Sequence, residues 1–228
     1  MKLMDMHNHS NWSDGDNDVE EIILNGIKNG LNLIGISDHF ETSKCNSIHV
    51  NELNSYIKTI ESMKQKYKDK ITILSGIEIC LNKDWCKVDC LPFEQFDYLD
   101  YVLFEYVDIF ENSVTLEEFE NYTCKVKCKK GLAHTNLLDL SEKYGIDKLL
   151  KLIKHNNLFW EINVNEGYEY FDYMIKNKEK NKVKNFLKKL NEYKIEITIG
   201  SDTHNLIFYE VDRIFMGNKL AQEILSKY

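Results

Sequence analysis

Apolar residues occur along this chain in two kinds of run, short ones typical of strands and longer ones typical of helices. Alternating or continuous apolar runs predict seven β-strands, at residues 2–6, 31–36, 70–77, 98–104, 131–134, 158–163 and 195–200. Between them, apolar positions with a period of 3.6 predict helices at residues 18–29, 50–67, 116–127, 146–154 and about 173–192. Strands and helices that alternate in this way predict an α/β protein built on a parallel sheet.

The predicted helices each have one apolar face. In residues 50–67, apolar side chains recur at three- and four-residue steps, with lysine and glutamate between them, at Leu53, Tyr56, Ile57, Ile60, Met63 and Tyr67. The lysine-rich segment 176–194 repeats the pattern at Val183, Phe186, Leu187 and Leu190. Its lysines are therefore interpreted as a solvated helix face rather than as a polyanion-binding surface.

The connections between these units are short, which bears on domain organisation. Pro92 is the only proline, and no segment has the composition of a linker. A chain of 228 residues can bury one sizeable core, so we expect a single domain over residues 1–228. Seven strand-helix units favour a closed or nearly closed TIM-like barrel, and an open doubly wound sheet is the alternative, because periodicity does not distinguish the two.

The composition is that of a globular protein, with 43% hydrophobic and 29% charged residues. No apolar run approaches the roughly 18 residues that a membrane span needs, so no membrane association is expected. The first residues, MKLMDMH, resemble no secretion signal, and we expect a cytoplasmic protein. The net charge of −8 argues against nucleic acid as a partner.

Six cysteines are present, and two pairs have CxxxC spacing, Cys86 with Cys90 and Cys124 with Cys128. In a cytoplasmic chain, reduced thiols are the expected state. Structural zinc sites favour CxxC spacing and need four ligands together. Ordinary core or surface thiols are therefore the preferred interpretation, with a structural metal site as the alternative.

Histidines and carboxylates concentrate where the predicted strands end. Five of the seven histidines lie there, together with acidic residues, and the set is His7, His9, Asp38, His39, Glu78, His134, Asp202 and His204. The carboxyl ends of all strands share one rim in a parallel barrel, so residues far apart in sequence converge. The sequence therefore predicts a cluster of these side chains on that rim.

The spacing of His7 and His9 suits a metal site. On an extended segment, residues i and i+2 point to the same face, so both imidazoles can reach one ion while Asn8 points away. Imidazole and carboxylate groups together suit divalent transition metals. Such ions generate a hydroxide nucleophile from water at neutral pH, which makes hydrolysis the expected chemistry. The sequence has no Walker loop, no GxGxxG after the first strand and no GxSxG.

Five motifs in order, DMHNHSNWSDGD, IGISDHF, SGIEI, LAHTN and IGSDTH, span nearly the whole chain. In this order and spacing they resemble the PHP (polymerase and histidinol phosphatase) domain family. The resemblance implies a distorted (βα)7 barrel that holds up to three divalent ions, usually zinc, manganese or iron. It also implies phosphoester hydrolysis.

The resemblance also implies which residues bind the ions. One ion would take His7, His9, Glu78 and Asp202, and a second would share Glu78 and take His134. The third would take Asp14, His39 and His204. Of this set, the expected catalytic residues are His7, His9, Glu78, His134, Asp202 and His204.

The sequence departs from the family pattern at the end of the fourth strand. A histidine usually follows that strand and completes the second ion's ligands, but this chain reads DYVLFEYVD, with Val107 near that position. Glu105 and Asp108 are nearby carboxylates, and we predict Glu105 as the replacement ligand. An added carboxylate favours manganese or iron over zinc. The alternative is a weak or empty second site.

Candidate substrate contacts are fewer. Arg213 is the only arginine, so it is the single residue that could clamp a phosphate in bidentate fashion. Asn163 points toward the same rim, and Trp12 and Tyr168 could form walls for a ring of the substrate. Surface pairing of Arg213 and local packing of the two aromatic side chains are the alternatives.

These observations predict a metal-dependent phosphoesterase that acts on a small phosphorylated metabolite, in the manner of histidinol phosphatases, through a metal-bridging hydroxide with two or three ions. Histidinol phosphate itself is not the favoured substrate, because such phosphatases use several arginines. The alternatives are an exonuclease or phosphotyrosine phosphatase of the same family, and a catalytically degenerate, metal-binding regulatory domain. The sequence predicts no oligomeric state.

Overall fold

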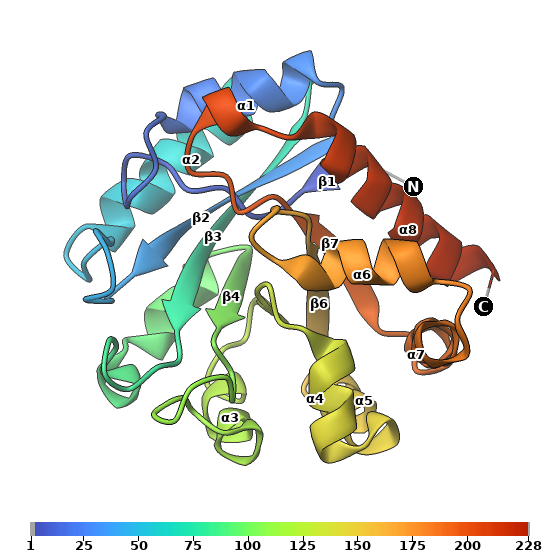
Figure 1. Cartoon of the computed structure of the whole chain (residues 1–228). Helices are drawn as coiled ribbons and strands as arrows, with labels where there is room; N and C mark the ends of the chain where they lie inside the picture. The colour runs from blue at the N-terminus through green and yellow to red at the C-terminus, as the bar shows by residue number, and fades with distance from the viewer. Residues whose placement is uncertain (1–2, 228) are drawn as a thin grey trace.

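The computed structural model describes residues 3–227, and its centre is a sheet of seven parallel strands (Figure 1). The strands follow one another in chain order, and they are β1 (Met4–Asp5), β2 (Leu33–Phe40), β3 (Thr72–Cys80), β4 (Tyr101–Glu105), β5 (Lys129–Leu132), β6 (Leu158–Asn163) and β7 (Glu196–Gly200). The Met6 N–H donates to Ile199 O at 2.7 Å, which brings the first strand against the last. The sheet is therefore a nearly closed (βα)7 barrel, as predicted, and not an open doubly wound sheet.

All seven predicted strands are present, but their ends differ from the prediction. β6 has the predicted bounds, whereas β2 and β3 extend further in the carboxyl direction, so that His39 and Glu78 lie within strands rather than after them. The predicted strand 2–6 begins at Lys2, which lies outside the described residues. The strands extend because their polar ends pair with one another, as in the register of His39 beside Glu78.

Helices surround the strands on the outside (Figure 1). They are α1 (Val19–Lys28), α2 (Leu53–Tyr67), α3 (Leu116–Thr123), α4 (Leu137–Tyr144), α5 (Ile146–His155), α6 (Glu169–Asn177), α7 (Asn181–Glu192) and α8 (Val211–Lys227). Three short 3-10 helices lie at Val88–Cys90, Phe93–Tyr98 and Leu206–Phe208. None of the described helices is long and apolar enough to cross a membrane.

The prediction of a single helix at about 173–192 is wrong, because the chain forms α6 and α7 there with a break between them. Between Ile175 and Val183 no apolar residue is available to bury, and Lys180 has an extended backbone at the start of α7. The sequence reasoning also missed α4 and α8. α4 packs against α5, and α8 lies against β7 and β1 and packs Ile214, Leu220 and Ile224 into the core.

Two apolar layers hold these elements together. The larger lies between the sheet and the helices, where α2 buries Leu53, Tyr56 and Ile60, as its spacing predicted. The smaller fills the inside of the barrel with Met6, Tyr101, Leu103, Ala133 and Phe159. The clustered histidines and carboxylates lie beyond this apolar layer, at the carboxyl ends of the strands.

Candidate metal centre

A cluster of histidines and carboxylates lies at the carboxyl ends of the strands. The donors come from β2, β3, β4 and the segments after β1, β5 and β7, and the nine predicted metal ligands are His7, His9, Asp14, His39, Glu78, Glu105, His134, Asp202 and His204. Each of them has a nitrogen or oxygen within 4 Å of another member. The structure therefore brings the whole predicted set together, while metal ligation itself stays a prediction.

One group of donors surrounds the imidazoles of His7 and His9. Their Nε2 atoms lie 3.0 Å apart. Asp202 Oδ1 lies 3.5 Å from His7 Nε2 and 3.1 Å from His9 Nε2. Glu78 contributes Oε1 at 3.4 Å from His7 Nε2 and Oε2 at 3.6 Å from His9 Nε2. These four residues are the set that the family resemblance assigned to one ion.

A second group is centred on Asp14, in the loop between β1 and α1. Its Oδ1 lies 3.3 Å from His204 Nε2 and its Oδ2 lies 3.7 Å from His39 Nε2. His9 Nδ1 lies 3.7 Å from Asp14 Oδ1, so the ring of His9 stands between the two groups. The four side chains offer one donor atom each within a sphere suited to a metal ion.

The third group includes the end of β4, where the sequence departs from the family. His134 Nε2 lies 3.1 Å from Glu78 Oε1 and 3.5 Å from Glu105 Oε2. His39 Nδ1 lies 3.9 Å from Glu105 Oε1. Glu105 thus lies where a replacement ligand is expected, but both of its oxygens also accept hydrogen bonds from Lys44 Nζ at 2.9 Å. Lys44 was not among the predicted site residues.

These side chains fit divalent ions. Three buried atoms of the centre, His9 Nδ1, His39 Nδ1 and Glu78 Oε2, make no hydrogen bond within the described chain. The last two lie only 2.9 Å apart, without the geometry of a hydrogen bond. Buried polar atoms are rarely left without a partner, because their desolvation is then uncompensated. Imidazole nitrogens and carboxylate oxygens that converge without bonding one another are the donor set of a transition-metal site.

The electrostatics of the centre also suit cations. Burial lowers the pKa of His7, but the carboxylates of Glu161 and Glu78 outweigh it and raise that pKa well above its ordinary value. Burial and then repulsion from His39 lower the pKa of His9 to about 3. Burial acts to raise the pKa of Glu78, yet His7 and His39 hold it well below its usual range. At neutral pH Glu78 is therefore ionised and His9 is neutral, the forms that bind metal, whereas His7 carries a proton that a bound ion would displace.

Glu161 supports the centre from β6, and the sequence reasoning missed it. Its Oε1 lies 2.7 Å from His7 Nδ1, and its Oε2 accepts the backbone N–H of His134 at 2.6 Å. A carboxylate on Nδ1 fixes the tautomer that leaves Nε2 free to bind a metal. A Cβ on Gly200 would lie 1.7 Å from Glu161 Oε1, so only glycine fits there. The signal in the sequence was one acidic residue among the apolar residues LFWEI of the predicted strand.

Two further buried carboxylates hold the loops that carry the donors. Asp5 accepts hydrogen bonds from Ser201 and from the Tyr209 hydroxyl, and so ties the end of β1 to the segment after β7. Asp38 accepts bonds from Ser10 and Ser13 and so fixes the loop that contains Asp14. Both carboxylates position the backbone around the cluster.

The backbone is strained at two of the clustered residues. His134 has φ of 32° and Asp202 has φ of 52°, in the left-handed region that residues other than glycine rarely adopt. The bond from the His134 N–H to Glu161 holds the first of them. Strain of this kind persists where surrounding contacts over-determine the geometry, and it concentrates at functional sites.

Of the four predicted substrate contacts, Tyr168 and Asn163 lie near the clustered donors. The ring of Tyr168 stacks on His134 at 4.7 Å between centroids, and its hydroxyl donates to Asp202 Oδ2 at 3.1 Å. Asn163 is buried, and its Nδ2 lies 3.5 Å from Glu161 Oε1, beneath the cluster. Of these two residues, only Tyr168 contacts the clustered donors directly.

Arg213 and Trp12 are directed elsewhere. The Arg213 guanidinium pairs in bidentate fashion with Asp172 at 3.0 and 3.3 Å and also donates to Val164 O. Trp12 packs edge-on against Tyr56 with ring centroids 5.8 Å apart. Arg213 therefore forms an ion pair that joins α8 to α6, and Trp12 packs against the core.

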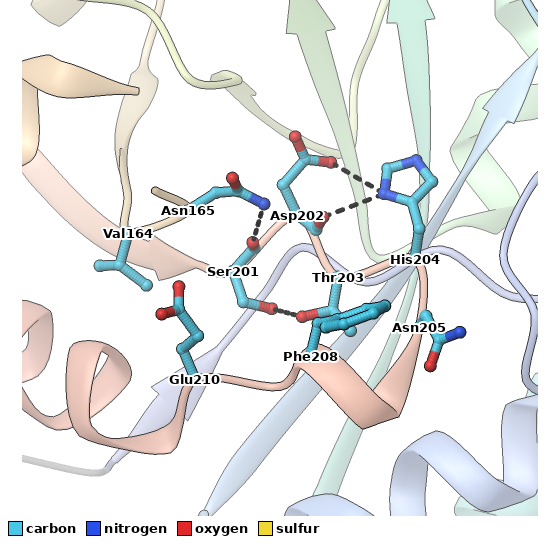
Figure 2. A pocket seen from close by; sticks show the side chains of 9 residues that line it. All are labelled: Val164, Asn165, Ser201, Asp202, Thr203, His204, Asn205, Phe208 and Glu210. Carbon is cyan, nitrogen blue, oxygen red and sulfur yellow. Dashed lines mark hydrogen bonds and ion pairs between the residues drawn. The ribbon is translucent and has the colours of Figure 1, made fainter. Parts of the chain in front are cut away.

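A pocket of about 200 Å³ opens beside the donors Asp202 and His204. Figure 2 shows its lining, in which Asn165 and Glu210 flank the segment after β7 and the ring of Phe208 lies below His204. The Phe208 side chain is 77% exposed at the mouth. All six cysteines are free thiols, and no described cysteine belongs to a group of side chains that could hold a metal ion.

A TIM-like barrel that gathers histidines and carboxylates at the carboxyl ends of its strands has the arrangement that metal-dependent hydrolysis requires. Residues 5–227 match the family model of the PHP domain. The chain therefore belongs to the PHP domain family, as the five sequence motifs predicted.

Individual relatives are distant. The chain is 26% identical over 217 residues to the DNA polymerase/3'-5' exonuclease PolX of Bacillus subtilis, and the match covers 89% of this chain but 34% of PolX. The chain thus spans about a third of the length of that relative.

Two solved structures share the fold. Histidinol phosphate phosphatase (HisK) of Lactococcus lactis, solved with zinc, L-histidinol and phosphate, is 17% identical, with a TM-score of 0.64 over 98% of this chain and 94% of that one. HisK of Listeria monocytogenes is also 17% identical, with a TM-score of 0.59 over 95% and 98%. At these identities the likeness shows the fold alone.

Proposed function

We propose that this protein is a metal-dependent phosphoesterase that hydrolyses a small phosphorylated metabolite. The observation that carries the proposal is the convergence of nine histidine and carboxylate side chains at one end of the barrel, with buried donor atoms that lack partners. Membership of the PHP domain family and the shared fold of the two HisK proteins support it.

His7, His9, Glu78 and Asp202 would hold one ion, and Asp14, His39 and His204 would hold another. Bound divalent ions supply Lewis-acid stabilisation of a phosphoryl group and lower the pKa of water. Glu161 keeps the proton of His7 on Nδ1, and Tyr168 donates a hydrogen bond that holds Asp202 in place. These contacts preorganise the donors before substrate arrives.

The surroundings of the donors favour a small substrate. The pocket beside Asp202 and His204 has a volume of about 200 Å³, which suits a leaving group of metabolite size. Asn165 offers an amide, and the exposed ring of Phe208 offers an apolar surface at the mouth. Because Arg213 is paired with Asp172, phosphate binding would depend on the ions rather than on a guanidinium.

A second candidate is hydrolysis of a nucleic acid end, favoured by the sequence similarity to PolX. The net charge of −8 opposes it, since nucleic acid binding depends on cationic surface. A labelled single-stranded oligonucleotide therefore belongs in the substrate panel.

The test combines turnover with metal content. Protein purified without chelator is assayed with added Mn²⁺, Zn²⁺ or Fe²⁺ on a panel of phosphorylated metabolites, histidinol phosphate and nucleotides included. We expect turnover that a His7→Ala, Asp202→Ala double variant loses, while His155→Ala, a change of an exposed histidine on α5, keeps it. Full turnover by the double variant, or none by the metal-loaded parent, would overturn the proposal.

A further inference from the structure

Lys44, in the loop 41–48 between β2 and α2, extends its ammonium into the metal centre. Its Nζ lies 2.9 Å from each oxygen of Glu105 and 3.3 Å from the Tyr106 hydroxyl. It also stands 4.9 Å from the centroid of the Tyr106 ring. The Lys44 side chain is 23% exposed and Glu105 is fully buried, so this ion pair is not a solvated surface contact.

The ammonium has no donor left for a substrate. A lysine has three N–H bonds, and here they match three acceptors, the two Glu105 oxygens and the Tyr106 hydroxyl. A phosphate could be contacted only by breaking one of these bonds. The position of Lys44 therefore indicates a fixed internal cation rather than a phosphate-binding side chain.

This cation lies beside one of the three donor groups. This group is a corner formed by Glu78, His134 and Glu105. In it, His134 Nε2 lies 3.1 Å from Glu78 Oε1 and 3.5 Å from Glu105 Oε2. Of the three donor groups, this corner is the one in which Glu105 lies beside His134. The groups around His7 and around Asp14 have no lysine within ion-pair distance in the described part of the chain.

An ion on Glu105 would compete with the ammonium for the same carboxylate. Metal–oxygen bonds of about 2.1 Å, added to the 2.9 Å hydrogen bond, would place the two positive charges within about 5 Å of each other. Like charges at this separation repel strongly in a buried site. Repulsion between the two cations therefore sets the ammonium and a divalent ion in competition for Glu105, and in the structure both Glu105 oxygens bind the ammonium.

We propose that the Lys44 ammonium, held by Glu105, takes the place of a divalent ion at the Glu78–His134 corner, so that the centre binds two divalent ions per chain. Glu105 then anchors Lys44 instead of replacing the absent strand-four histidine as a ligand. The inference rests on the proposed function in one respect, because the centre must bind divalent ions.

Metal stoichiometry tests this directly. Each protein is saturated with Mn²⁺, freed of excess ion by gel filtration, and measured by plasma mass spectrometry, with far-UV circular dichroism as the folding check. We expect two ions in the parent chain and two in Lys44→Arg, which keeps the charge. Lys44→Met, which frees the carboxylate, should bind three, and the double change Lys44→Met, Glu105→Gln should return to two.

Three ions in the parent chain, or two in folded Lys44→Met, would overturn the inference. Chemical labelling of the parent chain provides a second measurement that needs no variant. Reductive methylation followed by mass spectrometry should modify Lys44 slowly, and equally slowly after saturation with Mn²⁺. Faster methylation of Lys44 in the metal-loaded chain would mean that an ion displaces the ammonium from Glu105, and would also overturn the inference.

The same measurements separate this inference from the proposed function. Two ions without turnover on any substrate would support the role of Lys44 and overturn the phosphoesterase. Three ions with turnover would overturn the role of Lys44 alone. A parent chain that binds no divalent ion would overturn both.

Discussion

Replacing Glu161 with glutamine tests whether the carboxylate beneath the cluster sets the metal-binding form of His7. The carboxylate is buried and accepts hydrogen bonds from His7 Nδ1 at 2.7 Å, from the His134 backbone at 2.6 Å and from Asn163 Nδ2 at 3.5 Å. Glutamine keeps the shape but has only one acceptor oxygen. If the amide oxygen stays with the His134 N–H, the amide nitrogen faces His7 Nδ1 and drives the ring proton onto Nε2, the atom that must bind the metal.

The expected loss follows from this change. Replacing a residue that orients a metal ligand typically costs about 10- to 100-fold in metal affinity. This corresponds to about 1.4–2.7 kcal/mol, and one lost charged hydrogen bond has a similar free energy. We therefore expect Glu161→Gln to bind Mn²⁺ or Zn²⁺ about 10- to 100-fold more weakly at one site, with its fold intact.

The assay is a metal titration against a fluorescent chelator, with circular dichroism to check folding. Glu196→Gln is the matched control, because it makes the same chemical change at an exposed residue of β7 that pairs with Lys129. Metal affinity in Glu161→Gln within twofold of the control would refute the role assigned to Glu161.

Three other predictions follow. Gly200→Ala places a Cβ 1.7 Å from Glu161 Oε1, so we expect this variant to lose about 1–3 kcal/mol of stability in thermal melts. We also expect it to bind metal more weakly than Glu161→Gln does. A melting curve unchanged from that of the parent chain would contradict this prediction. Burial lowers the pKa of His39, but Glu78 and Cys45 together outweigh burial and raise that pKa to about 11. His39 therefore carries a proton near neutral pH that an ion bound by the Asp14 group must displace, so metal affinity should rise with pH and calorimetry in buffers of different ionisation enthalpy should detect proton release. Arg213→Ala removes the partly exposed ion pair with α6 and should cost about 1 kcal/mol or less of stability while leaving KM unchanged; a clear rise in KM would restore Arg213 as a substrate contact.

Local sequence signals predicted most of the barrel. The longer strands β2, β3 and β6 contain apolar runs that are buried, and β6 was predicted to the residue. The same reasoning failed at α6 and α7, because lysines in the segment 176–182 fit a continuous helix as well as a break. Such a choice depends on which apolar side chains the neighbouring elements can bury.

The candidate ligands could also be predicted, since histidines and acidic residues after apolar runs are unusual and the family motifs order them. Glu161 and Lys44 could not be found in this way. Glu161 is a single acid within a strand, and Lys44 is one of many lysines, in a loop far in sequence from its partner Glu105. Their roles depend on contacts across 154 and 61 positions of the chain.

The amino-acid sequence by itself determined the alternation of strands and helices, the side chains available as metal donors, and the end of the barrel at which they gather. Period and residue type are local properties, and parallel strands place all their carboxyl ends together. Only the tertiary structure decided which donors face one another, that Arg213 is engaged with Asp172, and that Lys44 is fixed on Glu105. These outcomes depend on distances of 3–4 Å between residues from different strands and loops, and closure of the barrel sets those distances.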